Sequence, residues 1–196
     1  MGGTVKMKRV ILSSILAGIM VAIGTIVYLN SQSMLGAFLF AIGLLTILHF
    51  KLDLFTGKIP YIKNYKELPY ILMVLIGNVL GCCILFAFPS SLAIQHLELQ
   101  LTLHPLVVFI KSMLCNVLIY IAVEVYKRND IITVILSVAT FIVAGFDHSI
   151  ARICLIISAR VFNIDVLLYI IIVIVGNALG GILFHRIRGI INNEVC

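Results

Sequence analysis

Apolar residues fill most of the chain in long segments that short polar connectors separate. A helix needs about 20 apolar residues to cross the hydrocarbon core of a bilayer. Six segments reach this length, so we expect six spanning helices. They cover residues 10–29, 34–56, 69–88, 105–126, 131–160 and 165–185. The connector at residues 89–104 is the longest, and we expect it to be a loop.

Polar residues interrupt the second and fifth segments, as "HFKLDLFTGK" (49–58) and "GFDHSIAR" (145–152). Irregular backbone at membrane depth is tolerated only against protein or around a water-filled cavity. We therefore expect both helices to break, near residues 51–57 and 145–149. Ser149 is expected to cap the half-helix that follows the second break, because a serine hydroxyl suits that position.

The charged residues of these interruptions are expected to have structural roles. Asp147 and Arg152 can bind backbone groups that the break leaves free, or pair with Lys51 and Asp53. A fixed carboxylate in a transport path would repel an anion, which favours the structural role for Asp147.

The two halves of the chain resemble each other. "IGNVLGCCILF" (76–86) matches "VGNALGGILF" (175–184), and both contain a GxxxG spacing that lets helix backbones approach closely. Each half holds three spans, so the second copy is inverted. Interrupted helices at matching positions of inverted repeats indicate a substrate site near the membrane midplane. The expected first repeat covers residues 8–88 and the second 105–188, within one transmembrane domain, 1–196.

Composition agrees with an integral membrane protein, since 62% of the 196 residues are hydrophobic and 11% are charged. A soluble domain carries about 25% charged residues. The five cysteines do not form a disulfide pattern and are expected to act as small apolar residues. Four of them lie in apolar segments, and Cys196 ends the chain.

Basic residues indicate the orientation, because cytoplasmic segments of membrane proteins are rich in Lys and Arg. With the N-terminus inside, the inner segments hold ten of them and the outer connectors hold only Arg160. Three more, Lys51, Lys111 and Arg152, lie within the spans. We therefore expect a multi-pass protein of the plasma membrane with both termini in the cytoplasm. The ten inner residues are Lys6, Lys8, Arg9, Lys58, Lys63, Lys66, Lys127, Arg128, Arg186 and Arg188.

Four motifs, "LDLFTGK" (52–58), "LCNVLIYIAV" (114–123), "AGFDHSIA" (144–151) and "GNALGG" (176–181), resemble the signatures of the formate–nitrite transporter family. The resemblance covers all six spans in order. It implies an all-α, aquaporin-like protomer with an inverted three-plus-three repeat and broken second and fifth helices. It also implies a homopentamer whose protomers each carry a pore for small monovalent anions or their acids, such as formate, nitrite, hydrosulfide or short monocarboxylates.

The same resemblance implies the site residues. His148 would be the central histidine and proton relay, with Thr56 and Asn116 as its neighbours. The outer apolar constriction would be formed by Phe40, Phe141 and Ile119, and the inner one by Leu44 and Leu54, with Ile119 near both. From the residues alone, Phe40, Phe141 and Leu44 could equally be ordinary core packing.

One position departs from the family pattern. The family usually has a lysine in the outer vestibule, and a gap-free count from Asn116 gives Gln100 there, with Glu98 and His104 nearby. Residues 89–110 contain no Lys or Arg. This departure puts the attraction of anions to the outer mouth in doubt and leaves a channel for a neutral small solute as the alternative.

A membrane enzyme or structural subunit is a third reading, with less support. The sequence has no metal-ligand cluster, no paired catalytic carboxylates and no nucleotide-binding loop. We therefore expect no catalysis, no cofactor and no nucleic-acid partner. The expected partners are a small anion, the lipid bilayer and further copies of the chain.

Overall fold

The computed structural model describes residues 2–193, which are helical almost throughout and contain no β-strand. The expectation of an all-α protein is confirmed. Cys196 lies outside the described residues. The α-helices are α1 (Gly2–Ser31), α2 (Met34–His49), α3 (Phe55–Lys58), α4 (Leu68–Cys82), α5 (Ser91–Leu101), α6 (Pro105–Tyr126), α7 (Ile131–Val143), α8 (Ser149–Ala159) and α9 (Ile164–Ile191). The 3₁₀ helices are η1 (Ile59–Tyr61), η2 (Tyr65–Glu67) and η3 (Cys83–Ala87).

Four helical stretches of the described chain are long and apolar enough to cross a membrane, and they correspond to the first, third, fourth and sixth expected spans. They are Met7–Ser31, Tyr65–Ala87, Pro105–Tyr126 and Ile164–Ile191. The other two expected spans are each divided by non-helical residues, at 50–54 between α2 and α3 and at 144–148 between α7 and α8. Large apolar side chains such as Leu72 and Ile132 are exposed on the outside, as a lipid-facing surface requires.

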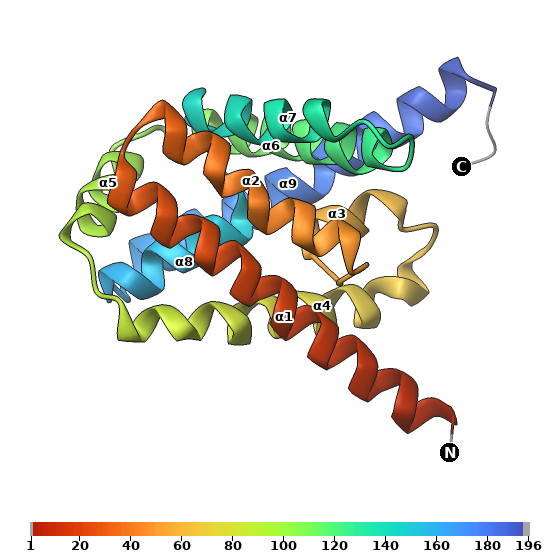
Figure 1. Cartoon of the computed structure of the whole chain (residues 1–196), viewed down its shortest axis with the longest axis horizontal. Helices are drawn as coiled ribbons and strands as arrows, with labels where there is room; N and C mark the ends of the chain where they lie inside the picture. The colour runs from red at the N-terminus through yellow and green to blue at the C-terminus, as the bar shows by residue number, and fades with distance from the viewer. Residues whose placement is uncertain (1, 194–196) are drawn as a thin grey trace.

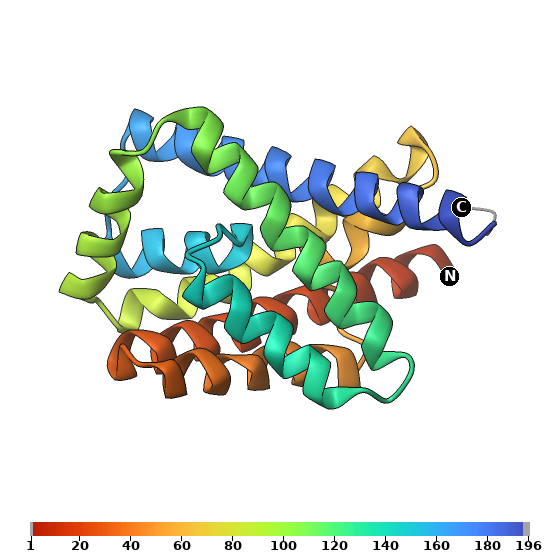
Figure 2. The same ribbon diagram turned by 90° about the horizontal axis from the view of Figure 1, so that it is seen from above.

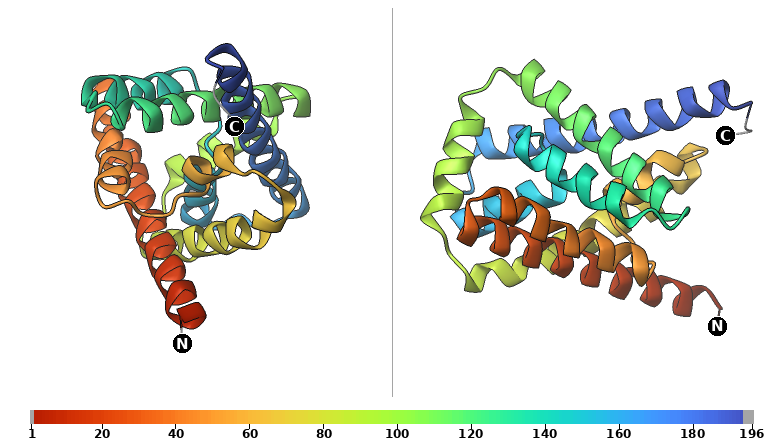
Figure 3. Two further views of the ribbon diagram at one scale, coloured as in Figure 1. Left: turned by 90° about the vertical axis from the view of Figure 1, so that its right-hand side faces the viewer. Right: turned by 45° about the horizontal axis from the view of Figure 1, so that its top comes forward.

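The helices run roughly along the long axis of the molecule, and both termini lie at the same end (Figure 1). α5 lies across the opposite end, where it connects two of the long helices (Figures 2 and 3). We call these the terminal end and the α5 end. The expectation of a loop at residues 89–104 is therefore wrong for residues 91–101. Ser90 begins the helix by accepting a hydrogen bond from the Ala93 backbone N–H, at 3.4 Å.

The GxxxG glycines lie where two pairs of helices meet most closely. A Cβ placed on Gly81 of α4 would lie 2.2 Å from the Ile15 carbonyl oxygen of α1. A Cβ on Gly180 of α9 would lie 2.2 Å from the Met113 carbonyl oxygen of α6. Any larger residue would therefore separate the α1–α4 and α6–α9 pairs, and these two contacts are equivalent in the two halves of the chain.

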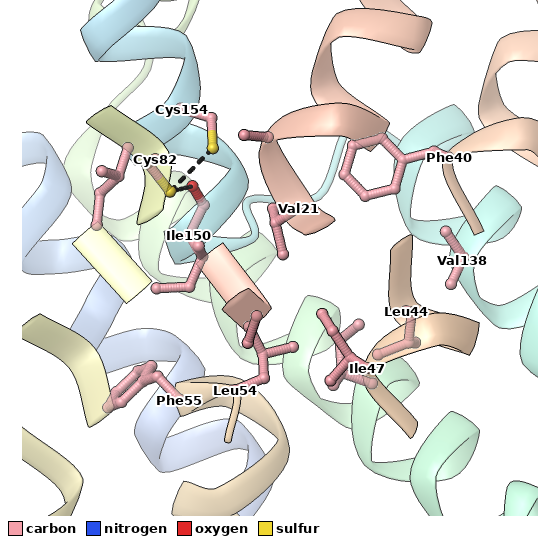
Figure 4. Close-up of a cluster of buried hydrophobic side chains, with 14 of the residues drawn as sticks. Val21, Phe40, Leu44, Ile47, Leu54, Phe55, Cys82, Val138, Ile150 and Cys154 are labelled. Atoms are coloured by element: carbon pink, nitrogen blue, oxygen red, sulfur yellow. Dashed lines mark hydrogen bonds between the residues drawn. The ribbon is translucent and has the colours of Figure 1, made fainter. Parts of the chain in front are cut away.

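The four described cysteines are free, and three of them are buried. Cys82 of α4 and Cys154 of α8 lie against each other, with their sulfur atoms 3.0 Å apart. Both belong to the apolar core shown in Figure 4, where the Sγ of Cys82 also contacts the Ile150 carbonyl oxygen at 3.8 Å.

Candidate functional site

His148 ends the non-helical segment before α8 and is 3% exposed. Its Nδ1 accepts a hydrogen bond from the Ala151 backbone N–H at 3.2 Å, so the histidine itself is the N-cap of α8. The expectation that Ser149 caps this helix is wrong, because Ser149 is already the first helical residue. On its other side, His148 Nε2 lies 2.9 Å from the Thr56 hydroxyl oxygen of α3.

Two asparagines hold the non-helical segments in matching ways. The side-chain oxygen of Asn78 accepts from the Phe55 backbone N–H at 2.8 Å, and its amide donates to the Asp53 carbonyl at 2.9 Å. The amide also donates to the Ser14 carbonyl of α1, at 2.8 Å. These bonds attach the start of α3 to two long helices.

In the second half of the chain, the side-chain oxygen of Asn177 accepts from the Ser149 backbone N–H at 2.8 Å. Its amide donates to the carbonyls of Asp147 and Ser112, at 2.8 and 2.7 Å. The asparagine of the shared "GN" dipeptide thus positions the first residue of each short helix. α3 carries Thr56, and α8 begins directly after His148.

Apolar side chains close the interior beside His148. They enclose a cavity of about 10 Å³, which is at the lower limit for one water molecule. The Phe40 and Phe141 rings meet edge to face with centroids 6.1 Å apart, and the Phe141 ring stacks on His148 at 5.7 Å. Figure 4 shows Val21 of α1, Leu44 and Ile47 of α2, and Leu54 of the segment before α3 converging on one region. The full lining is Val21, Phe40, Leu44, Ile47, Leu54, Ile119, Val138, Phe141 and His148.

Larger cavities lie on both sides of this apolar closure. The α5-side cavity, of about 270 Å³, is lined by Phe40, Phe141, His148 and residues of α5. The terminal-side cavity, of about 680 Å³, is lined by Leu44 and Leu54 together with residues from α3, η1 and α6. All five expected constriction residues, Ile119 included, are therefore brought to one narrow region between two cavities.

The expected neighbours of the histidine are placed differently. Thr56 contacts the His148 ring directly, whereas the amide of Asn116 donates to the Asn177 carbonyl at 2.8 Å. Gln100, which the gap-free count placed at the family's vestibule position, lines the α5-side cavity. Glu98 is exposed on α5, and His104 is the N-cap of α6.

Asp147 is completely buried directly beside His148. It does not pair with Lys51, as one reading of the sequence suggested: its Oδ1 lies 2.7 Å from Arg152 Nε, and its Oδ2 lies 3.7 Å from Lys111 Nζ. Asp53 likewise pairs not with Arg152 but with Lys58, at 3.0 Å. The contribution of Lys111 could not be seen from the sequence, because α6 meets the residues before α8 only in the folded chain.

Within residues 2–193, no group of three His, Cys, Asp or Glu side chains could hold a metal ion. The site thus consists of a buried histidine and a hydroxyl between two helix starts, an apolar closure, and a cavity on each side. Two cavities separated by an apolar closure inside a bundle of apolar helices indicate a membrane channel or transporter.

The chain matches the sequence profile of the "Formate/nitrite transporter" family over residues 3–188. It therefore belongs to the formate/nitrite transporter family, and the expected family is confirmed.

Two solved structures have a similar fold. One, described as "Pentameric formate channel with formate bound", has a TM-score of 0.83 and 20% identity, and the match covers 97% of this chain and 99% of that one. The other, described as "FNT family ion channel", has a TM-score of 0.85 and 19% identity, and covers 93% and 89%. No curated protein sequence matches the chain.

Proposed function

We propose that this chain forms a pore for small monovalent anions or their conjugate acids, with His148 as its central polar group. One observation carries the proposal: His148 and Thr56 lie in hydrogen-bond contact between two helix starts, directly beside the apolar closure that separates two cavities. A helix N-terminus favours negative charge, so an anion at this point would meet the start of α8. The solved relative with formate bound supports formate as the first substrate to test.

The apolar closure favours passage in the neutral form. Moving a bare carboxylate into an apolar medium costs tens of kcal/mol in the idealised limit. Protonating a carboxylic acid with a pKa of about 4.3 at pH 7 costs only about 3.7 kcal/mol, at about 1.36 kcal/mol per pH unit. A substrate anion therefore crosses more easily if it gains a proton at the closure and loses it on the far side.

The hydrogen bonds of His148 define how it would serve this step. Its Nδ1 accepts from the Ala151 N–H, so the neutral ring carries its proton on Nε2. This N–H points to Thr56 and is the group that an arriving anion would meet. To give a proton to the anion, the ring would first take one at Nδ1 from water in the α5-side cavity, which releases the Ala151 N–H. The imidazolium would then give its Nε2 proton to the anion and become neutral again.

We also propose the architecture that the motifs imply. α2 with α3, and α7 with α8, are the broken second and fifth spans of an inverted repeat, and the parallel bonding of Asn78 and Asn177 supports this reading. The terminal end faces the cytoplasm of a plasma-membrane protein, because the basic residues gather there. Labelling from outside of a cysteine introduced at Asn193 would contradict this orientation.

The proposed assembly is a homopentamer in which each protomer keeps its own pore. The fold of a relative described as pentameric and the exposed apolar faces support it. Native mass spectrometry of the detergent-solubilised protein is expected to give five copies. A spectrum of monomers or trimers alone would count against the proposal.

Radiolabelled flux into liposomes tests the function. We expect uptake of formate to exceed uptake of urea or glycerol, and to be absent from protein-free liposomes. The neutral-solute channel is the second candidate, since the apolar closure offers no fixed charge in its own wall. Faster uptake of urea or glycerol than of formate would favour that candidate and reject the anion pore.

A further inference from the structure

The α5-side cavity has a cation in its wall. Among the described residues that line this cavity, Arg152 is the only Lys, Arg, Asp or Glu, and it lies on α8 one turn after His148. Its side chain is 12% exposed, and its Nε–H binds Asp147 Oδ1 at 2.7 Å. A guanidinium has five N–H donors and stays charged at any physiological pH, so this bond leaves Arg152 able to act on the cavity.

Arg152 belongs to a buried cluster in which one carboxylate faces two cations. Asp147 is bound by Arg152, by Lys111 at 3.7 Å and by the Tyr169 hydroxyl at 3.0 Å. Lys111 also donates to Gln100 Oε1 at 2.8 Å. Two cations against one carboxylate give the cluster a net charge of +1. Because Lys111 and Asp147 do not line the cavity, the surplus charge acts on it through Arg152.

His96 does not supply a second positive charge under neutral conditions. It lies on α5, lines the same cavity, and packs against the Tyr28 ring with centroids 5.9 Å apart. Burial and the nearby Arg152 lower the pKa of His96 below its ordinary value of 6.5, so the ring is neutral at pH 7. The positive potential of the cavity therefore comes from Arg152.

We propose that Arg152 is the residue that attracts and orients the substrate anion in the α5-side cavity, and that Asp147 and Lys111 hold it there. This inference rests on the proposed function. Arg152 concentrates a small oxyanion within reach of His148 and the Phe40–Phe141 closure, and thereby selects anions over neutral solutes. It performs this role from the fifth span, whereas the position on α5 carries the uncharged Gln100.

Formate uptake by the intact protein in liposomes tests the assignment. Arg152→Gln is expected to raise the KM for formate by about tenfold, since electrostatic focusing raises local ion concentration by about 10 to 1,000-fold. Its maximal rate should stay within about twofold of wild type, because the lost interaction acts on binding. Arg152→Lys keeps the charge and should restore most of the affinity.

Salt dependence provides a readout that a purely structural role would not change. Between about 0.01 M and about 1 M salt the Debye length falls from about 30 Å to about 3 Å. The wild-type KM should rise over this range, and that of Arg152→Gln should stay constant. Arg160→Gln is the matched control, because Arg160 ends the same helix but donates to the Phe86 carbonyl away from the cavity.

Each outcome decides a separate point. A wild-type KM that ignores salt, or an assembled Arg152→Gln with wild-type KM and salt dependence, overturns the role of Arg152. An equal effect of Arg160→Gln would also overturn it, since only the net charge of that end would then matter. Absence of formate flux in the wild type would instead reject the proposed function itself. If Arg152→Gln does not assemble, the wild-type salt dependence and Arg152→Lys still decide.

Discussion

Replacement of His148 by phenylalanine is expected to abolish formate uptake. A phenyl ring cannot accept the Ala151 N–H that the imidazole accepts, nor offer an N–H to Thr56 or to an anion. It would also extend the apolar closure formed by Phe40 and Phe141. Uptake into liposomes should fall to the protein-free level, a loss of at least about 100-fold, or about 2.7 kcal/mol at about 1.36 kcal/mol per tenfold.

His148→Asn is the matched variant, because asparagine is a good N-cap residue and still offers an N–H. It should retain partial uptake. Wild-type uptake should rise from about pH 8 to about pH 5, because the protonated substrate and a transiently protonated ring both become easier to form, and the variant, which lacks the ring, should show a weaker rise. The pH dependence of uptake that remains in His148→Asn comes from protonation of the substrate. Wild-type rates and an unchanged pH profile in His148→Phe would show that the histidine has only a structural role.

Replacement of Asn177 by leucine is expected to destabilise the protein more than any conservative exposed substitution. It removes one acceptor and two donor contacts, and leaves the buried Ser149 N–H and Asp147 carbonyl without partners. Each unsatisfied buried group costs about 1–3 kcal/mol, so the two together cost about 2–6 kcal/mol. The midpoint of thermal unfolding in detergent should fall accordingly, and formate flux should be lost because His148 loses its position.

Asn163→Leu is the control, since Asn163 caps the exposed start of α9 through a single bond to the Val166 N–H. Loss of such a cap costs about 1 kcal/mol. Asn78→Leu should resemble Asn177→Leu, because it removes the matching bonds before α3. If Asn177→Leu lowers the unfolding midpoint no more than Asn163→Leu, the asparagine bonds do not hold the start of α8.

Spacing along one chain was sufficient to identify the family, and it indicated several features of the site. The family match over residues 3–188 confirms the resemblance. The GxxxG motifs indicated close helix contacts, and Gly81 and Gly180 make them. The resemblance implied that His148 is the central histidine with Thr56 as a neighbour, and the ring does lie beside Thr56 in the core.

Other features escaped the sequence because they depend on partners from distant segments. α5 has only 11 residues, too few to cross a membrane, so its sequence resembled a loop connector. Ser149 was expected to cap α8, but the helix begins one residue earlier, at Ser149 itself, and its N-cap is His148. The partners of Asp147 come from α6, α8 and α9, which no local pattern can bring together.

The sequence by itself determined that the chain is an all-helical membrane protein of the formate/nitrite transporter family, because hydrophobic length and family motifs are properties of the linear chain. Only the tertiary structure decided which groups meet. It gave the "GN" asparagines their backbone partners, set the apolar closure between two cavities, and left Arg152 as the cation of one of them. The physical reason is that burial forces each polar group to find a partner, and for the groups at the starts of α3 and α8 that partner lies more than 20 residues away in the chain.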